Sequence, residues 1–222
     1  MIPLGDASRR LTSAPVVTIL LIAINVVVFL VELAAGDQFV TQWSVTPADI
    51  WAGHDLITIL TAMFLHASWS HILGNMVFLY AFGPEIEDAM GPARFIVFYL
   101  VGGAIAMLSQ VAFDPHSTVP NLGASGAIAA VMGAFIVTYP RDNIRTLLFL
   151  GFFIRVTFVS AWLLIGFWFL MQLIDVGAVA NAQTGGVAYL AHVGGFVFGV
   201  VFGRLFDNSA RLASQTLNTD DS

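Results

Sequence analysis

Long apolar segments separated by short polar ones dominate this chain. The first covers Val16–Leu33, directly after Pro15, and it is too long for the core of a signal peptide. Further apolar segments follow at about 70–89, 94–113, 125–139, 157–176 and 187–206. The pattern predicts six membrane helices within residues 15–206, flanked by polar tails at 1–14 and 207–222. The C-terminal tail is expected to be mobile.

The segments between these helices also carry a membrane pattern. Residues 34–68 form a long amphiphilic loop with interface-seeking tryptophans. Residues 146–156 are apolar around Arg155 and are expected to lie along the membrane interface. A glycine-rich loop at 177–186 leads to the last helix. No strand is expected, so the predicted fold class is all-α.

Composition agrees with a polytopic membrane protein of one domain. The 222 residues are 58% hydrophobic and 10% charged, whereas soluble domains carry about 25% charged residues. The absence of cysteine excludes disulfides and thiolate metal sites, and no metal or other cofactor is expected. The net charge of -6, with no basic tract, disfavours nucleic-acid binding.

The basic residues predict the orientation in the membrane. Six spans place both termini on one side, and all eight basic residues fall on that side: Arg9, Arg10, Arg94, Arg141, Arg145, Arg155, Arg204 and Arg211. The positive-inside rule then puts the termini in the cytoplasm. The five histidines fall on the outer side: His54, His66, His71, His116 and His192. Net charge and the lack of a transit peptide favour a prokaryotic plasma membrane, with an organelle as the alternative.

The stretch Gly123-Ala124-Ser125-Gly126 stands at the head of the fourth apolar segment. That segment has about 15 residues, or roughly 22 Å as a helix, so it cannot cross a bilayer of ~30 Å. If its foot lies at one surface, Ser125 lies below the other, beside the free N–H groups of a helix N-terminus. This placement suits a nucleophile beside an anion site. The alternative is a small residue at a helix contact.

His192 lies one turn into the last helix and starts a face of small residues. Glycines recur on this face every four residues, at Gly195, Gly199 and Gly203. The fourth helix offers a matching small face, formed either by Gly126 and Ala130 or by Ser125, Ala129 and Gly133, so the two helices can approach closely. Such packing would bring His192 within reach of the Ser125 hydroxyl as a general base. Alternatively, His192 only satisfies a neighbouring helix.

His71 and Asn75 share one face near the outer end of the second helix, because they are four residues apart. Both side chains can donate hydrogen bonds to a developing oxyanion, together with the backbone N–H of Ser125. The alternative is a polar pair that holds helices together.

Three motifs occur in order on helices two, four and six: His71-Ile-Leu-Gly-Asn75, Gly123-Ala-Ser125-Gly126 and Ala191-His192-Val-Gly-Gly195. Together they resemble the rhomboid intramembrane serine proteases. The resemblance implies a six-helix core and a Ser–His dyad without a third carboxylate. It makes Ser125 the nucleophile, His192 the base, and His71, Asn75 and the Ser125 backbone the oxyanion donors. It also gives supporting roles to Gly123, Gly126 and Gly195, and a structural role in the first loop to His66.

The family's substrates are single-span membrane proteins that are cut in or near the bilayer, here in its outer half. Helix five and the loop before helix six are the segments that the resemblance associates with substrate entry and with capping the site. Two positions depart from the family pattern. A Trp-Arg pair early in the first loop is replaced by Ile57-Thr58, and an aromatic residue four positions after the serine is replaced by Ala129.

Other functions are less compatible with the sequence. No His-Glu-x-x-His motif occurs, which disfavours a zinc protease. Asp88, Asp114 and Asp175 lie near predicted helix ends, which disfavours an aspartyl dyad. A non-catalytic rhomboid-like protein that binds or chaperones membrane proteins is the main alternative, and a channel or transporter is a weaker one.

Overall fold

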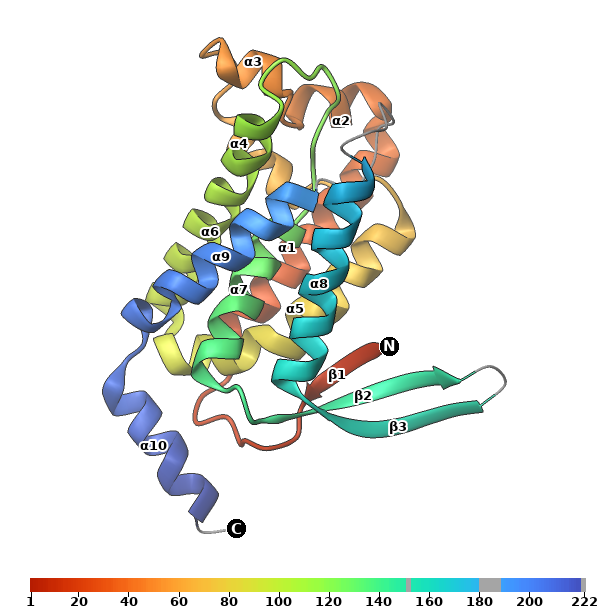
Figure 1. Cartoon of the computed structure of the whole chain (residues 1–222). Coiled ribbons are helices and arrows are strands. Elements are labelled where there is room, and N and C mark those ends of the chain that lie inside the picture. Colours follow the sequence, from red (N-terminus) through yellow and green to blue (C-terminus); the bar gives the residue numbers. More distant parts are fainter. Residues whose placement is uncertain (151–152, 180–188, 221–222) are drawn as a thin grey trace.

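The apolar segments of the sequence form a bundle of long helices (Figure 1). The computed structural model describes residues 1–150, 153–179 and 189–220. The long helices start and end within a few residues of the predicted bounds: α1 (Val16–Ala35), α5 (Trp69–Met90), α6 (Pro92–Phe113), α7 (Ser125–Thr138), α8 (Ala161–Val179) and α9 (Tyr189–Phe206). By length and composition, α1, α6 and α9 can each cross a membrane. The count of six spans stays a prediction.

Helix α7 forms the centre of the bundle. It packs against α5, α6, α8 and α9, and every residue from Gly126 to Phe135 is buried. A helix that is apolar and buried on all sides needs neighbours all round, which explains why the shortest of these helices has the interior position.

The predicted close approach of the fourth and sixth helices is confirmed. A side-chain carbon added to Gly195 would collide with the carbonyl oxygen of Gly126, and one added to Gly199 would collide with that of Ala130. The glycines therefore let the backbones of α7 and α9 touch.

The first loop contains short helices at the upper end of the bundle in Figure 1: α2 (Asp37–Trp43), α3 (Pro47–Trp51), α4 (Thr58–Thr61) and the 3₁₀ helix η1 (Ala62–Phe64). Glu32 of α1 anchors the loop, because its carboxylate accepts the backbone N–H of His66 at 3.1 and 3.2 Å. The Thr61 hydroxyl donates to the carbonyl of Trp43 at 2.8 Å. A buried carboxylate of α1 thus holds the end of the first loop.

The chain is mostly helical, as predicted, but the expectation that it contains no strand is wrong, because it also forms a three-stranded antiparallel sheet in the order β1-β2-β3. The strands are β1 (Ile2–Asp6), β2 (Asn143–Leu150) and β3 (Phe153–Ser160). The segment 146–156, expected along the interface, belongs to the β2–β3 hairpin, and α8 begins at Ala161 rather than near Thr157. The β-branched and aromatic residues of β3, such as Val156, Phe158 and Val159, favour a strand.

The C-terminal tail, expected to be mobile, forms helix α10 (Ser209–Asp220). Its Gln215 and Arg211 both donate to the carboxylate of Asp88, at 2.6 and 3.4 Å. The same carboxylate accepts the hydroxyls of Thr12 and Ser13, each at 2.7 Å. A buried acid of α5 thus joins the N-terminal segment to the C-terminal helix.

The neighbouring Glu87 caps helix α1 from another element. Its carboxylate accepts the backbone N–H groups of Val17 and Thr18 at 2.9 and 2.7 Å, at a helix start where Pro15 provides no side-chain cap. A negative group at this position also suits the helix dipole.

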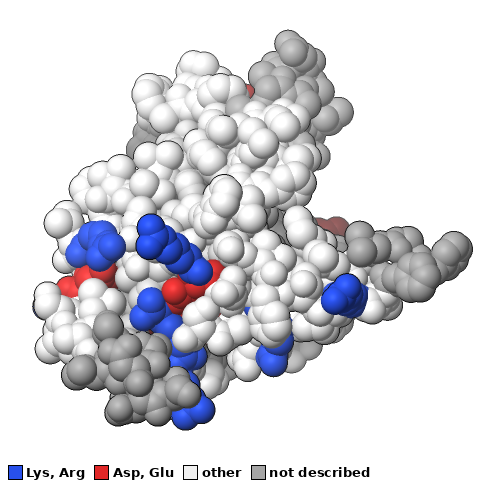
Figure 2. Space-filling model, turned by 60° about the horizontal axis from the view of Figure 1, so that its bottom comes forward, with Lys and Arg blue, Asp and Glu red and all other residues white. Residues whose placement is uncertain are grey.

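Arginine side chains gather at the end of the bundle that carries the sheet and both termini (Figure 2). Arg9 forms an ion pair with Asp142, and Arg94 donates to the carbonyl of Asp207 at 2.9 Å. Arg204 donates to the carbonyl of Val137 at 3.1 Å. These arginines hold together chain segments that are distant in the sequence.

Asp6 of β1 makes stability depend on pH. Burial, together with the nearby carboxylate of Asp142, raises the pKa of Asp6 from 3.8 to about 7. Between these values the folded chain keeps a proton that the unfolded chain has lost, so stability should fall as pH rises from 4 to 7. We expect Asp6→Asn to reduce the decline in melting temperature across this range, whereas Asp37→Asn on the exposed start of α2 should not. Identical slopes in wild type and Asp6→Asn would contradict the prediction.

Candidate active site

Ser125 is the first residue of α7, and a glycine controls the approach of the chain to it. Gly123 has a φ of +126°, a conformation that other residues rarely adopt. A side-chain carbon at this position would also come within 2.9 Å of the His71 ring. The Gly123 N–H donates to the carbonyl of Ala62 at 2.8 Å, which ties this turn to the first loop.

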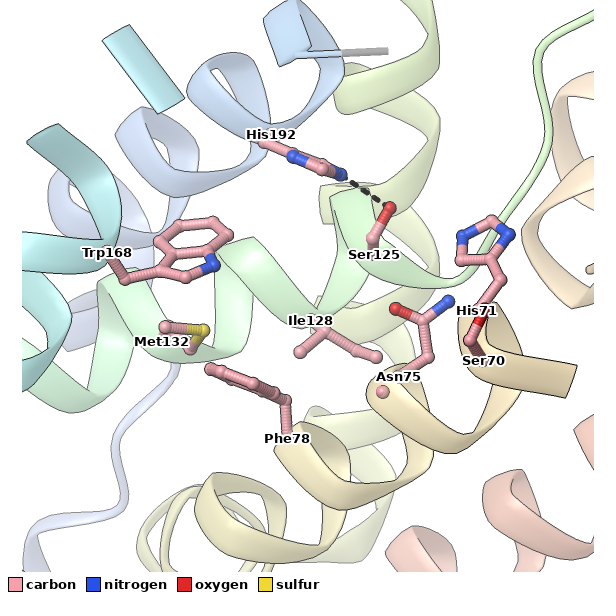
Figure 3. Close-up of a pocket in the computed structure, with 10 residues that line it drawn as sticks. Ser70, His71, Asn75, Phe78, Ser125, Ile128, Met132, Trp168 and His192 are labelled. Atoms are coloured by element: carbon pink, nitrogen blue, oxygen red, sulfur yellow. Dashed lines mark hydrogen bonds between the residues drawn. The ribbon is translucent and has the colours of Figure 1, made fainter. Parts of the chain in front are cut away.

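The structure brings Ser125 and His192 together. Nε2 of His192 lies 2.7 Å from the Ser125 Oγ, although the residues are 67 positions apart (Figure 3). The contact follows from the close packing of α7 and α9, because His192 lies three residues before Gly195 on α9. His192 is buried, with 8% of its surface exposed.

A pocket of about 230 Å³ opens beside this pair. Its polar side is formed by Ser70, His71, Asn75, Ser125 and His192. Its apolar wall is formed by Phe78, Ile128, Met132 and Trp168 (Figure 3). The pocket thus combines a reactive polar edge with an apolar surface that suits an aliphatic side chain.

His71 and Asn75 lie on the other side of Ser125 from His192 (Figure 3). Helix α5 presents both, and its start is fixed by Ser68, whose hydroxyl accepts the His71 backbone N–H at 3.2 Å. The Asn75 amide nitrogen is buried and has no hydrogen-bond partner within the described residues. A buried donor without a partner is unusual and is available to a ligand.

His66 lies in the first loop behind this donor pair. It is 2% exposed, and its ring meets the rings of His71 and Phe29 edge-on, with centroids 5.2 and 6.4 Å away. His66 therefore supports His71 and does not line the pocket.

Two residues of α8 contact His192, and the sequence analysis did not single them out. Gln172 Oε1 lies 2.6 Å from His192 Nδ1, and the Trp168 ring lies 5.8 Å from the imidazole with a tilt of 39°. Their spacing of four residues places both on one helix face. A glutamine inside a strongly apolar segment was the available signal.

No metal-binding group of three or more His, Cys, Asp or Glu side chains occurs in the part of the chain that the structure describes. The loop expected at 177–186, which is predicted to cap the site, lies largely outside the described residues.

The fold and this pocket define a class: a helical integral membrane protein with a serine and a histidine in contact inside the bundle. The family model of the Rhomboid domain matches residues 53–208, which is most of the chain. The chain therefore belongs to the rhomboid family.

Similar proteins carry rhomboid names. The chain is 33% identical to RHOMBOID-like protein 12, mitochondrial, of Arabidopsis thaliana, over 61% of this chain and 44% of that protein. It is 27% identical to Rhomboid protease GluP of Bacillus subtilis, over 83% of this chain and 34% of that protein. It is 28% identical to Rhomboid protease GlpG of Salmonella choleraesuis, over 81% of this chain and 63% of that protein. The chain thus spans less than two thirds of the length of each of these relatives, two of which are named as rhomboid proteases.

Proposed function

We propose that this chain is an intramembrane serine endopeptidase in which Ser125 is the nucleophile and His192 the general base. The observation that carries the proposal is the 2.7 Å contact between Ser125 Oγ and His192 Nε2 at the edge of a pocket. A serine is activated when a neighbouring base can take its proton, and this distance is within hydrogen-bond reach.

The reaction proceeds in two steps. Ser125 Oγ attacks the carbonyl carbon of the scissile peptide bond while its proton passes to His192 Nε2. The tetrahedral intermediate collapses, the C–N bond breaks, and His192 returns the proton to the leaving amine. Water then hydrolyses the acyl-enzyme with His192 again as base.

The developing oxyanion is stabilised from the opposite side of the serine. The Ser125 backbone N–H is one of the free donors at the start of α7, and the unpartnered Asn75 amide is a second. The His71 ring contributes a third donor. Three glycines support the site: Gly123 leaves room for the His71 ring, Gly126 for the Ala106 methyl group, and Gly195 for the backbone of Gly126.

The substrates proposed are single-span membrane proteins, cut in or near the outer half of the bilayer. A peptide bond within a helix is shielded by backbone hydrogen bonds, so the scissile segment must unwind before Ser125 can attack it. The apolar wall of the pocket suits an aliphatic side chain next to the cleaved bond.

The orientation proposed places both termini in the cytoplasm of a prokaryotic plasma membrane. The arginines at the end of the bundle with the termini support this orientation through the positive-inside rule (Figure 2). The mitochondrial name of the Arabidopsis thaliana relative makes an organelle membrane the alternative compartment.

Proteolysis in proteoliposomes tests the proposal. The substrate is a model single-span protein with an alanine-rich, glycine-containing outer segment, and a fluorophosphonate probe reports on Ser125 separately. Cleavage with labelling of Ser125 is the expected result. If the chain shows no cleavage and Ser125 is not labelled, the result would favour the non-catalytic binder of membrane proteins.

Asn75→Ala is expected to lower kcat by about 10²–10³-fold and to leave KM nearly unchanged, because an oxyanion donor acts only in the transition state. Steady-state cleavage kinetics measure both constants. Asn143→Ala, at an exposed position of the hairpin, is the matched control and should behave as wild type. A rise in KM with unchanged kcat would instead assign Asn75 to substrate binding.

A further inference from the structure

The face of His192 turned away from Ser125 is occupied by an amide from another helix. His192 Nδ1 lies 2.6 Å from Gln172 Oε1, and both residues are 8% exposed. An amide oxygen can only accept a hydrogen bond, so the ring nitrogen in this contact carries the hydrogen. With the hydrogen on Nδ1, the neutral ring keeps its lone pair on Nε2, the atom that lies 2.7 Å from Ser125 Oγ.

We propose that Gln172 is a positioning residue, which holds His192 in the tautomer and orientation that let Nε2 take the Ser125 proton. This inference rests on the proposed protease function and deepens it. The catalytic pair becomes a chain of three side chains, Ser125, His192 and Gln172, contributed by α7, α9 and α8.

The second contact from α8 restricts the imidazole in another direction. Trp168 lies one helical turn before Gln172, and its ring lies 5.8 Å from the imidazole with a tilt of 39°. Trp168 also lies 6.3 Å from the ring of Phe196, so the packing of α8 on α9 fixes the indole. Gln172 therefore fixes the imidazole through one atom, and Trp168 restricts the plane of the ring.

These contacts explain how His192 is oriented although α7 carries Ala129, and not an aromatic residue, four positions after Ser125. Ala129 is fully buried and its methyl group is too small to orient an imidazole. The orienting groups come instead from α8, one turn apart and on one face. A glutamine suits this role inside a membrane protein because it accepts the hydrogen bond without bringing a buried charge.

Two substitutions separate the hydrogen bond from the packing of the residue. Gln172→Leu has similar bulk but no acceptor, and we expect kcat to fall by about 10²-fold while KM changes little. Labelling of Ser125 by a fluorophosphonate should slow by a similar factor, because it depends on the same activated hydroxyl. Gln172→Glu restores the acceptor and should recover most of this loss.

Leu173→Ala is the matched control, because Leu173 follows Gln172 and is 44% exposed on the outer face of α8. It should keep both the cleavage rate and the labelling rate. Melting temperatures of all variants in detergent show whether each one folds.

The outcomes distinguish this inference from the proposed function. A wild-type chain that is neither labelled nor active would refute the protease itself. An active wild type with equal kcat and labelling rates in Gln172→Leu would overturn the positioning role alone. The positioning role would also be overturned if Gln172→Leu lowered both kcat and the melting temperature and Gln172→Glu did not recover kcat. A change confined to KM would overturn it as well.

Discussion

Ser125→Ala and His192→Ala are each expected to abolish cleavage, with kcat falling by roughly 10⁴–10⁶-fold. Without its hydroxyl Ser125 cannot act as nucleophile, and without the imidazole its proton loses the acceptor that lies 2.7 Å away. Both residues lie at a pocket edge, so removing their polar atoms should leave the fold intact. Cleavage of the model substrate in proteoliposomes measures the effect, and a melting temperature near that of wild type shows that folding is preserved.

Matched substitutions give this prediction its control. Ser109→Ala removes a hydroxyl that donates to the carbonyl of Ile105, one turn earlier on α6, and should keep activity. His116→Ala removes an exposed histidine after α6 and should also keep activity. The double variant Ser125→Ala/His192→Ala should be no slower than either single variant, because residues that act as a unit are not additive. Near-normal activity in either single variant would contradict the dyad.

The sequence predicts the helices well and the sheet poorly, for a physical reason. Each long helix is an apolar run bounded by polar residues, and such a run is a local signal. The strands β2 and β3 also form an apolar run, in which Leu147, Phe149 and Val156 fit a membrane interface equally well. What distinguishes a strand from an interfacial segment here is the antiparallel pairing with β1, in which Ile2 lies beside Leu147. This pairing is a contact between segments that are distant in the sequence.

The site shows the same division between local and distant information. The spacing of His71 and Asn75, and the glycines that follow His192, can be interpreted on a single helix. The contacts of Gln172 and Trp168 with His192 depend on the rotation of α8 against α9, which no local pattern encodes. The anchoring of His66 by Glu32 is likewise a contact between α1 and the first loop.

Gly199→Ala is expected to destabilise the chain by about 3 kcal/mol, at the upper end of the usual cost of overpacking. The added methyl group would meet the backbone of Ala130, which cannot rotate away as a flexible side chain can, so α7 and α9 must separate. At about 2–4 °C per kcal/mol, the melting temperature should fall by about 6–12 °C. The control is Gly166→Ala on α8, where an added carbon has no neighbour within 4 Å and helix propensity alone should act.

The same substitution should also slow catalysis, because α7 and α9 carry Ser125 and His192 respectively. A shift of about 1 Å between reacting groups can reduce the rate by about 10²-fold. Gly199 lies seven residues beyond His192 and does not line the pocket, so a loss of kcat would come from helix separation and not from a lost contact with substrate. Equal melting temperatures in Gly199→Ala and Gly166→Ala would mean that α7 and α9 are not held at backbone contact. The 2.7 Å hydrogen bond between serine and histidine would then need another explanation.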